Sequence, residues 1–219
     1  MAGIAGGHSL RGLGNFRAVV KPYNIIHNPL HPDPDRLKTV VSHLHECSGM
    51  TAAGWSEAFD IYPCIQRQDV VESINASHKM IVRLAKEAGL QEVCVFEDDV
   101  YFPSPDGLGY WLVRKPAVYK MYLAATYGER NGDMAPYPVG LHAYFIHSSF
   151  YDEFLALPPY RHIDTALEGK GPFHVCYPYA AIQRKGWSAN LRKEVDYNQS
   201  LQENDLYTGV DPDLFTTLD

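Results

Sequence analysis

Apolar residues follow two alternating spacings over the first hundred positions. Short apolar runs predict strands at residues 16–26, 58–63 and 93–96, and Pro22 divides the first of these. Stretches with apolar residues every three or four positions predict two intervening helices, one after Asp35 and one over residues 75–88. This strand–helix order predicts an α/β fold with a mostly parallel central sheet flanked by helices.

The ends of both helices are marked by their sequence. Asp35 is a plausible N-cap for the first helix, and a glycine follows the last apolar residue of each helix, Gly49 and Gly89. The core-facing residues predicted for the first helix are Leu37, Val40, Val41 and Leu44, and those for the second are Ile81, Leu84, Ala85 and Ala88.

The second half of the chain is less regular. Strands are predicted at 119–125, 141–146 and 173–181, and a helix from Ser148 that ends before Pro158. The Gly/Pro-rich residues 128–138 are a candidate flap. We divide the chain into a flexible tail (1–15), one catalytic domain (16–190) and a C-terminal tail or lid (191–219).

Three acids follow the apolar strand at 93–96. Glu97, Asp98 and Asp99 repel one another, and placing them beside apolar residues costs desolvation. A divalent cation would offset both costs, and ligands in such folds bind at the carboxyl ends of strands. Alternation along an extended backbone puts Glu97 and Asp99 on one side and Asp98 on the other. The alternative is a solvated acidic turn.

Composition narrows the class of protein. The net charge of -7 argues against a nucleic-acid partner, and no apolar run approaches the length of a membrane span. The four cysteines form no CxxC pair, which favours free thiols in a reducing compartment. We therefore expect a cytoplasmic protein, free or peripheral to a membrane.

Two of the histidines have alternative interpretations. His78 is either a core histidine or a ligand contact, and His142 points either into the core or into a cleft.

Several short motifs resemble those of one family in order and spacing. Ser77-His78 followed by Val95-Phe96-Glu97-Asp98-Asp99 resembles the "SH … EDD" signature of glycosyltransferase family 25, which includes lipooligosaccharide and collagen galactosyltransferases. Three later segments resemble its "G-x-H-A-Y", "hydrophobic-D" and "P … Q … S" motifs, and they are Gly140-Leu141-His142-Ala143-Tyr144, His162-Ile163-Asp164, and Tyr177-Pro178 to Gln183 with Ser188. The chain lacks the family's "N-L-x-x-R-x-x-R" after the first strand.

The resemblance implies a glycosyltransferase-A fold, a UDP-sugar donor and Mn²⁺ or Mg²⁺. It implies that Asp99 ligates the metal, with His174 as a third-ligand candidate. Donor contacts are expected from a larger set, namely Glu97, Asp98, His27, Asn28, Arg36, His78 and His142. Asp164 is the candidate base that takes the proton from an acceptor hydroxyl in an inverting transfer.

Two other functions remain open from the residues alone. One is a metal-dependent phosphoesterase or nucleotide hydrolase, which also uses clustered acids and histidines. The other is a non-catalytic carbohydrate-binding protein of the same fold. The partners we expect are a nucleotide sugar and a glycan or other hydroxyl acceptor.

Overall fold

The computed structural model describes residues 20–209. The predicted N-terminal tail, the first strand's residues before Val20 and the last ten residues of the predicted C-terminal tail lie outside that range. Within it, no helix is long and apolar enough to cross a membrane.

The centre of the molecule is a seven-stranded sheet in the order β2-β1-β3-β7-β5-β8-β6. Its strands are β1 (Tyr23–His27), β2 (Phe59–Pro63), β3 (Glu92–Glu97), β5 (Met121–Leu123), β6 (Met134–Ala135), β7 (Ala143–His147) and β8 (Phe173–Val175). Strands β1, β2, β3, β5 and β8 run in one direction, whereas β7 and β6 run against them. The prediction of an α/β fold with a mostly parallel sheet is confirmed.

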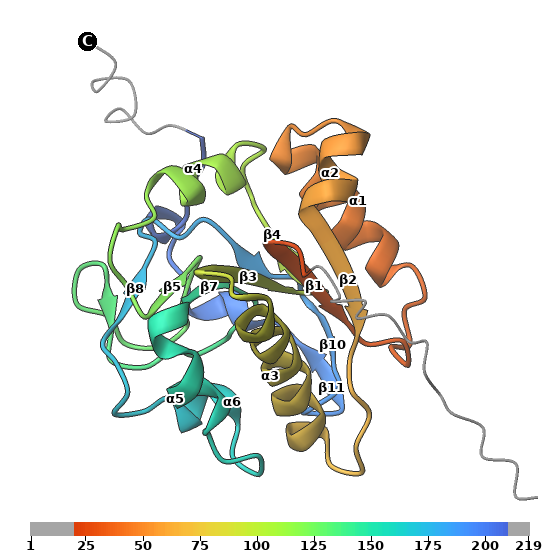
Figure 1. Ribbon diagram of the computed structural model, residues 1–219. Helices are drawn as coiled ribbons and strands as arrows, with labels where there is room; N and C mark the ends of the chain where they lie inside the picture. The colour runs from red at the N-terminus through yellow and green to blue at the C-terminus, as the bar shows by residue number, and fades with distance from the viewer. Residues whose placement is uncertain (1–19, 210–219) are drawn as a thin grey trace, which may run out of the picture.

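Helices cover both faces of this sheet (Figure 1). The helices α1 (Arg36–Ser48), α2 (Ala52–Ala58) and α4 (Gly107–Val113) lie on one face, and α3 (Val70–Ala88), α5 (Tyr151–Leu155) and α6 (Ile163–Ala166) lie on the other. Each face buries its own apolar cluster. Val40 and Leu44 of α1 pack in the first, and Ile81, Val82 and Ala85 of α3 pack in the second.

The two predicted helices form, with one shifted boundary. Helix α1 follows Asp35 and ends at Gly49, whose φ of 61° is left-handed, as glycine allows. Helix α3 begins at Val70 rather than near position 75, because the Asp69 carboxylate accepts a hydrogen bond from the backbone N–H of Glu72. This cap adds a turn that the apolar periodicity did not reveal. The pattern also did not predict α2 and α4.

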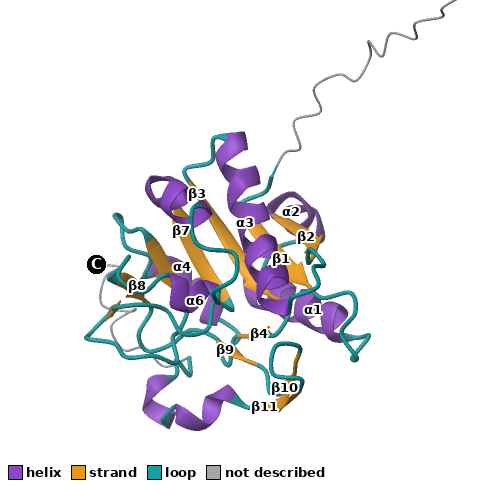
Figure 2. Ribbon diagram, turned by 90° about the horizontal axis from the view of Figure 1, so that it is seen from below, coloured by secondary structure: helices purple, strands orange, loops and turns teal. Residues whose placement is uncertain are grey.

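Smaller elements gather at one end of the sheet (Figure 2). They are β4 (Val100–Tyr101), β9 (Ile182–Gln183), β10 (Gly186–Ser188) and β11 (Lys193–Val195). The 3-10 helices are η1 (Ser148–Phe150), which follows β7 at the opposite end of the sheet, η2 (Tyr197–Ser200) and η3 (Glu203–Asp205). The pairing of β4 with β9 places Gln183 opposite Val100, directly after the acids.

Two segments predicted as irregular are attached to the domain. The candidate flap carries β6, which pairs with β8. Two residues of the segment after residue 190 contact the rest of the domain. Asn198 accepts a hydrogen bond from the Tyr127 hydroxyl, and the ring of Tyr207 stacks on that of Tyr110 with 3.8 Å between centroids. The domain boundary at 190 and the lid role remain predictions.

We predict that Asp69→Ala lowers the free energy of unfolding by about 1 kcal/mol, because it removes the side-chain cap of α3. Asp35→Ala is the matched control, since Asp35 holds the same position before α1 but makes no side-chain cap hydrogen bond. That control should stay within about 0.5 kcal/mol of wild type. Urea unfolding followed by circular dichroism measures both, and equal losses would contradict the assignment.

Candidate active site

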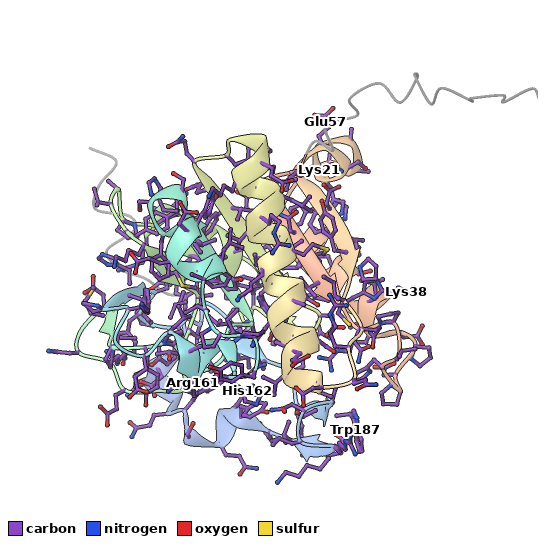
Figure 3. All side chains as sticks on the ribbon, turned by 60° about the horizontal axis from the view of Figure 1, so that its bottom comes forward. Lys21, Lys38, Glu57, Arg161, His162 and Trp187 are labelled. Carbon is purple, nitrogen blue, oxygen red and sulfur yellow. The ribbon has the colours of Figure 1, made fainter. Side chains whose placement is uncertain are left out.

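A cavity of about 350 Å³ lies at the carboxyl ends of β1 and β3. Figure 3 places Trp187 and His162, which line it, at one end of the molecule, and Lys21 and Glu57, which precede β1 and β2, at the other. The predicted site residues that line this cavity are Asn28, Arg36, His78, Glu97, Asp98, Asp99 and Asp164.

Glu97 ends β3 and is held by His78 from α3. Oε1 of Glu97 lies 3.1 Å from Nε2 of His78, and the hydroxyl of Tyr144 lies 2.9 Å from Nδ1. Because a carboxylate only accepts hydrogen bonds, Nε2 of His78 is the donor in the contact with Glu97. Burial alone would raise the pKa of Glu97, but the His78 hydrogen bond, the nearby histidines and Arg36 outweigh it and lower that pKa.

Asp98 is buried and has both carboxylate oxygens occupied. Oδ1 accepts from Nε of Arg36 at 2.7 Å, and Oδ2 accepts from the backbone N–H of Asn28 at 2.7 Å. It therefore ties the start of α1 and the loop after β1 to the acid cluster. These bonds hold the Asp98 carboxylate in place, and its contact with a donor remains a prediction.

Asp99 differs because one of its oxygens has no partner. Oδ2 lies 3.0 Å from Nη2 of Arg36, whereas Oδ1 is buried without a hydrogen-bond partner among the described residues. Burial and then the charge of Glu97 outweigh the attraction of Arg36 and raise the pKa of Asp99 to about 7. An unsatisfied buried carboxylate oxygen is a position where a cation or a donated hydrogen bond is favourable.

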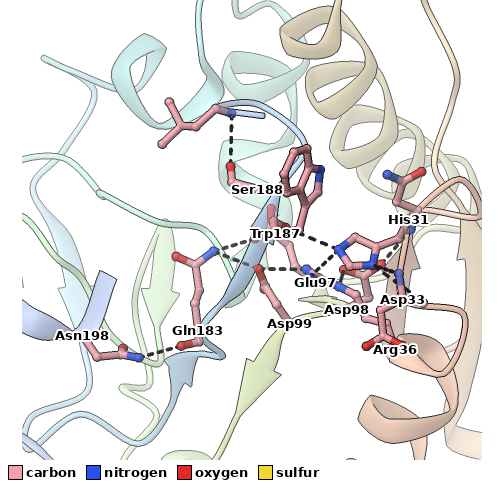
Figure 4. Close-up of polar contacts among 12 residues, drawn as sticks. His31, Asp33, Arg36, Glu97, Asp98, Asp99, Gln183, Trp187, Ser188 and Asn198 are labelled. Carbon is pink, nitrogen blue, oxygen red and sulfur yellow. Dashed lines mark hydrogen bonds and ion pairs between the residues drawn. The ribbon is translucent and has the colours of Figure 1, made fainter. Parts of the chain in front are cut away.

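Glu97 and Asp99 face a common amide (Figure 4). Nε2 of Gln183 lies 3.4 Å from Oε2 of Glu97 and 3.3 Å from Oδ2 of Asp99. The strand ends at Glu97 and the next two residues form a turn, yet the first and third acids share this partner while Asp98 faces Asn28. Asp98 and Asp99 nonetheless share Arg36, so the three acids are not divided into two separate sides.

Asp164 lies in the first turn of α6, after His162 as N-cap. One of its oxygens accepts from the backbone N–H of Thr165 at 2.8 Å. The residue is half-buried and lines the same cavity as the acid cluster.

His27 and His142 do not reach the cavity. His27 belongs to β1, and its carbonyl accepts from Cys64. His142 is fully buried behind Glu97, whose N–H donates to the His142 carbonyl. Its ring nitrogen Nε2 lies 3.4 Å from the carbonyl oxygen of Ala181. Burial lowers the pKa of His142 to about 4 against the opposing effect of Glu97, so the ring is neutral near pH 7.

His174 also lies away from the acids. His174 pairs with Tyr122 of β5, which pairs with Phe145 of β7, which in turn pairs with Cys94 of β3. His174 is therefore three strands away from Cys94, and Cys94 precedes Glu97 by three residues. At the usual strand spacing that is about 14 Å across the sheet alone. Its nearest acid is Asp133, with 4.0 Å between Nδ1 and Oδ2. The structure therefore does not place His174 beside Asp99, because strands β5 and β7 of the sheet lie between β8 and β3.

The donor set was tested for a divalent cation. Within residues 20–209, no group of three or more His, Cys, Asp and Glu side chains could hold a metal ion. The carboxylates are nonetheless the hard ligands that Mn²⁺ and Mg²⁺ prefer, and Asp99 offers its free Oδ1. Arg36 lies against the other oxygen, so the position on Asp99 that fits such an ion is Oδ1.

Three contacts of the site were not predicted. Gln183 was quoted in the family motif without a role, and its position depends on the pairing of β9 with β4. Nε2 of His31 lies 3.0 Å from Nη1 of Arg36 and 3.3 Å from the carbonyl oxygen of Trp187. The contacts of Gln183 and Trp187 join segments far apart in the chain, which no local pattern reveals.

No family model matches the chain, and no curated protein matches it. Among solved structures it is similar to a glycosyltransferase involved in glycosylation of the major capsid of PBCV-1, with TM-score 0.48, 13% identity and coverage of 72% of this chain and 82% of that one. A Pyrobaculum calidifontis mannosyltransferase in complex with GDP-Man and Mn²⁺ gives TM-score 0.44, 11% identity and coverage of 73% and 55%.

A Drosophila galactosyltransferase 7 mutant complexed with manganese, UDP-Gal and xylobiose gives TM-score 0.37 and 10% identity, with 60% of this chain and 51% of that one covered. Glycosyltransferases are thus among the structures that this chain resembles. With every one of these TM-scores below 0.5, the likenesses do not establish its activity.

We predict that the contribution of Asp99 to the stability of the protein falls as pH rises from about 4 to about 7, the raised pKa of Asp99. In that window the folded state binds the Asp99 proton and the unfolded state does not. The side chain that Asp99→Asn introduces cannot ionise. The free energy of unfolding of this variant minus that of wild type should therefore increase by more than about 1 kcal/mol as pH rises across the window. Glu57→Gln, at an exposed position on α2, is the charge control, and parallel pH profiles for Asp99→Asn and wild type would contradict this prediction.

Proposed function

We propose that the chain is a glycosyltransferase that moves a hexose from a UDP-sugar to a hydroxyl group of a glycan or another acceptor. The observation that carries this proposal is the cavity at the strand ends, which gathers three adjacent carboxylates, the guanidinium of Arg36 and the separate carboxylate of Asp164. The motif resemblance to glycosyltransferase family 25 supports the same choice, since its quoted acids and His78 lie together in this cavity.

The donor would be held by residues of both signs. Arg36 is suited to the diphosphate, because a guanidinium binds phosphate oxygens in a bidentate manner. Glu97, fixed by His78, would accept hydrogen bonds from the ribose hydroxyls. Asp99 would ligate a Mn²⁺ or Mg²⁺ ion, which when bound supplies positive charge against the charge that develops on the leaving diphosphate.

Asp164 is the proposed base. In an inverting transfer the acceptor oxygen attacks the anomeric carbon while a carboxylate takes its proton. Asp164 lines the cavity and, among the residues that the structure describes, makes no hydrogen bond or ion pair with the acid cluster, so it can serve the acceptor while Glu97, Asp98 and Asp99 serve the donor.

The reaction class is tested by incubating the full chain with Mn²⁺ and a panel of UDP-sugars and measuring UDP release. We expect metal-dependent release from one sugar or a few, stimulated by hydroxyl acceptors. Thermal stabilisation by UDP without release under any condition would favour the carbohydrate-binding alternative. Phosphate release from simple phosphate esters, with no response to UDP-sugars, would favour the hydrolase.

The base is tested by Asp164→Asn. Transfer should fall about 10²- to 10⁴-fold, because the proton acceptor is lost. UDP affinity should change little, since the donor contacts lie elsewhere. Glu168→Gln, an exposed acid just after α6 that pairs with Arg161, controls for the lost charge and should retain activity. Full transfer by Asp164→Asn would remove Asp164 from this role.

A further inference from the structure

The guanidinium of Arg36 serves as the cation of the acid cluster. Nε lies 2.7 Å from Oδ1 of Asp98, Nη2 lies 3.0 Å from Oδ2 of Asp99, and Nη1 lies 3.0 Å from Nε2 of His31. Each of the three guanidinium nitrogens therefore has a partner, two of them carboxylates and one the His31 ring, and the side chain is only 17% exposed. A positive charge here offsets the repulsion between two adjacent carboxylates.

The same two carboxylates are the ones a divalent ion would use. Asp99 keeps Oδ1 free, whereas Asp98 has Oδ2 bound by the backbone of Asn28 and Oδ1 bound by Arg36. An ion on Asp99 would therefore lie within a few ångströms of a guanidinium of like charge, which disfavours it. Both oxygens of Asp98 already accept a hydrogen bond, and the Arg36 guanidinium lies against Oδ1, so an ion approaching Asp98 there meets that charge as well.

Arg36 is placed to leave the acids without unfolding a helix. It is the first residue of α1, follows an irregular loop, and borders two cavities, one of about 350 Å³ and one of about 430 Å³. Both cavities share Asp98 and Asp99 with it. A long side chain at this position can exchange a carboxylate for a phosphate by changing rotamers alone, and phosphate matches its fork of donors.

We propose that Arg36 is an internal counter-ion that competes with a divalent cation for Asp98 and Asp99, and that a nucleoside diphosphate relieves the competition by drawing Arg36 onto its phosphates. This inference rests on the proposed function and adds to it how the binding of the metal and the binding of the diphosphate depend on each other. The metal alone binds weakly, and metal and diphosphate bind together with positive coupling, which by linkage acts equally on both affinities.

The test measures binding of Mn²⁺ to the full chain from the electron paramagnetic resonance signal of the free ion, with and without UDP. In the absence of UDP, Arg36→Gln should bind Mn²⁺ about tenfold or more tightly than wild type, because the competing charge is gone. Lys38→Gln removes an exposed positive charge from the same helix and should change that affinity less than about twofold. Adding UDP should tighten Mn²⁺ binding about tenfold or more in wild type and much less in Arg36→Gln.

An unchanged or weaker affinity of Arg36→Gln for Mn²⁺ alone would overturn the competition and leave Arg36 as a structural tie. Equal UDP coupling in Arg36→Gln and wild type would overturn the transfer of Arg36 to phosphate. If Arg36→Gln does not fold, Arg36→Lys, which keeps the charge without the fork, should still lose most of the coupling. Wild-type coupling below about twofold would by itself refute the proposal.

The Mn²⁺-binding measurements and the UDP measurements can fail independently, so they separate this inference from the proposed function. Failure of wild type to bind UDP under any condition would count against the donor assignment, yet the Mn²⁺ comparison without UDP would still decide the competition. Conversely, UDP-sugar turnover with no effect of Arg36→Gln on Mn²⁺ binding would leave the glycosyltransferase intact and reject the counter-ion.

Discussion

Three adjacent carboxylates at the end of a buried strand are the constraint on which this end of the molecule depends. The preceding residues Val93 to Phe96 are fully buried, so the strand carries Glu97 and its neighbours to the edge of the apolar core, where water can solvate them only in part. Charges in that position are tolerated only if other groups compensate them. The arrangement of the surrounding segments follows from supplying those groups.

Each compensating group comes from a different segment. Arg36 opens α1, Asn28 follows β1, His78 is in the middle of α3, and Gln183 belongs to the short strand β9. The acids therefore connect elements on both faces of the sheet and the C-terminal segment. Replacing a single partner would leave a buried charge uncompensated, which costs far more than the net contribution of the pair.

The sequence predicted the elements with strong local signals and the residues at their ends. The sheet, α1 and most of α3 followed from apolar periodicity, and the rule that ligands bind at strand ends singled out Glu97, Asp99 and Asn28, which line the cavity. It could not predict the antiparallel insertion of β7 between β3 and β5, since strand order depends on packing across the whole sheet. His174 was misplaced for the same reason, because its distance from the acids is set by register across three strands.

The cluster is divided between a fixed part and an exchangeable part. Glu97 is tied to His78, which is itself tied to Tyr144 inside the core, so its carboxylate is oriented whether or not a ligand is bound. Within residues 20–209, Asp99 has a buried oxygen without a partner, and its pKa is raised, both of which cost stability in the free protein. A fold that only needed to cover a strand end could use an apolar or singly charged residue there without this cost. The unsatisfied oxygen beside a movable guanidinium is therefore better explained by a ligand that completes the site.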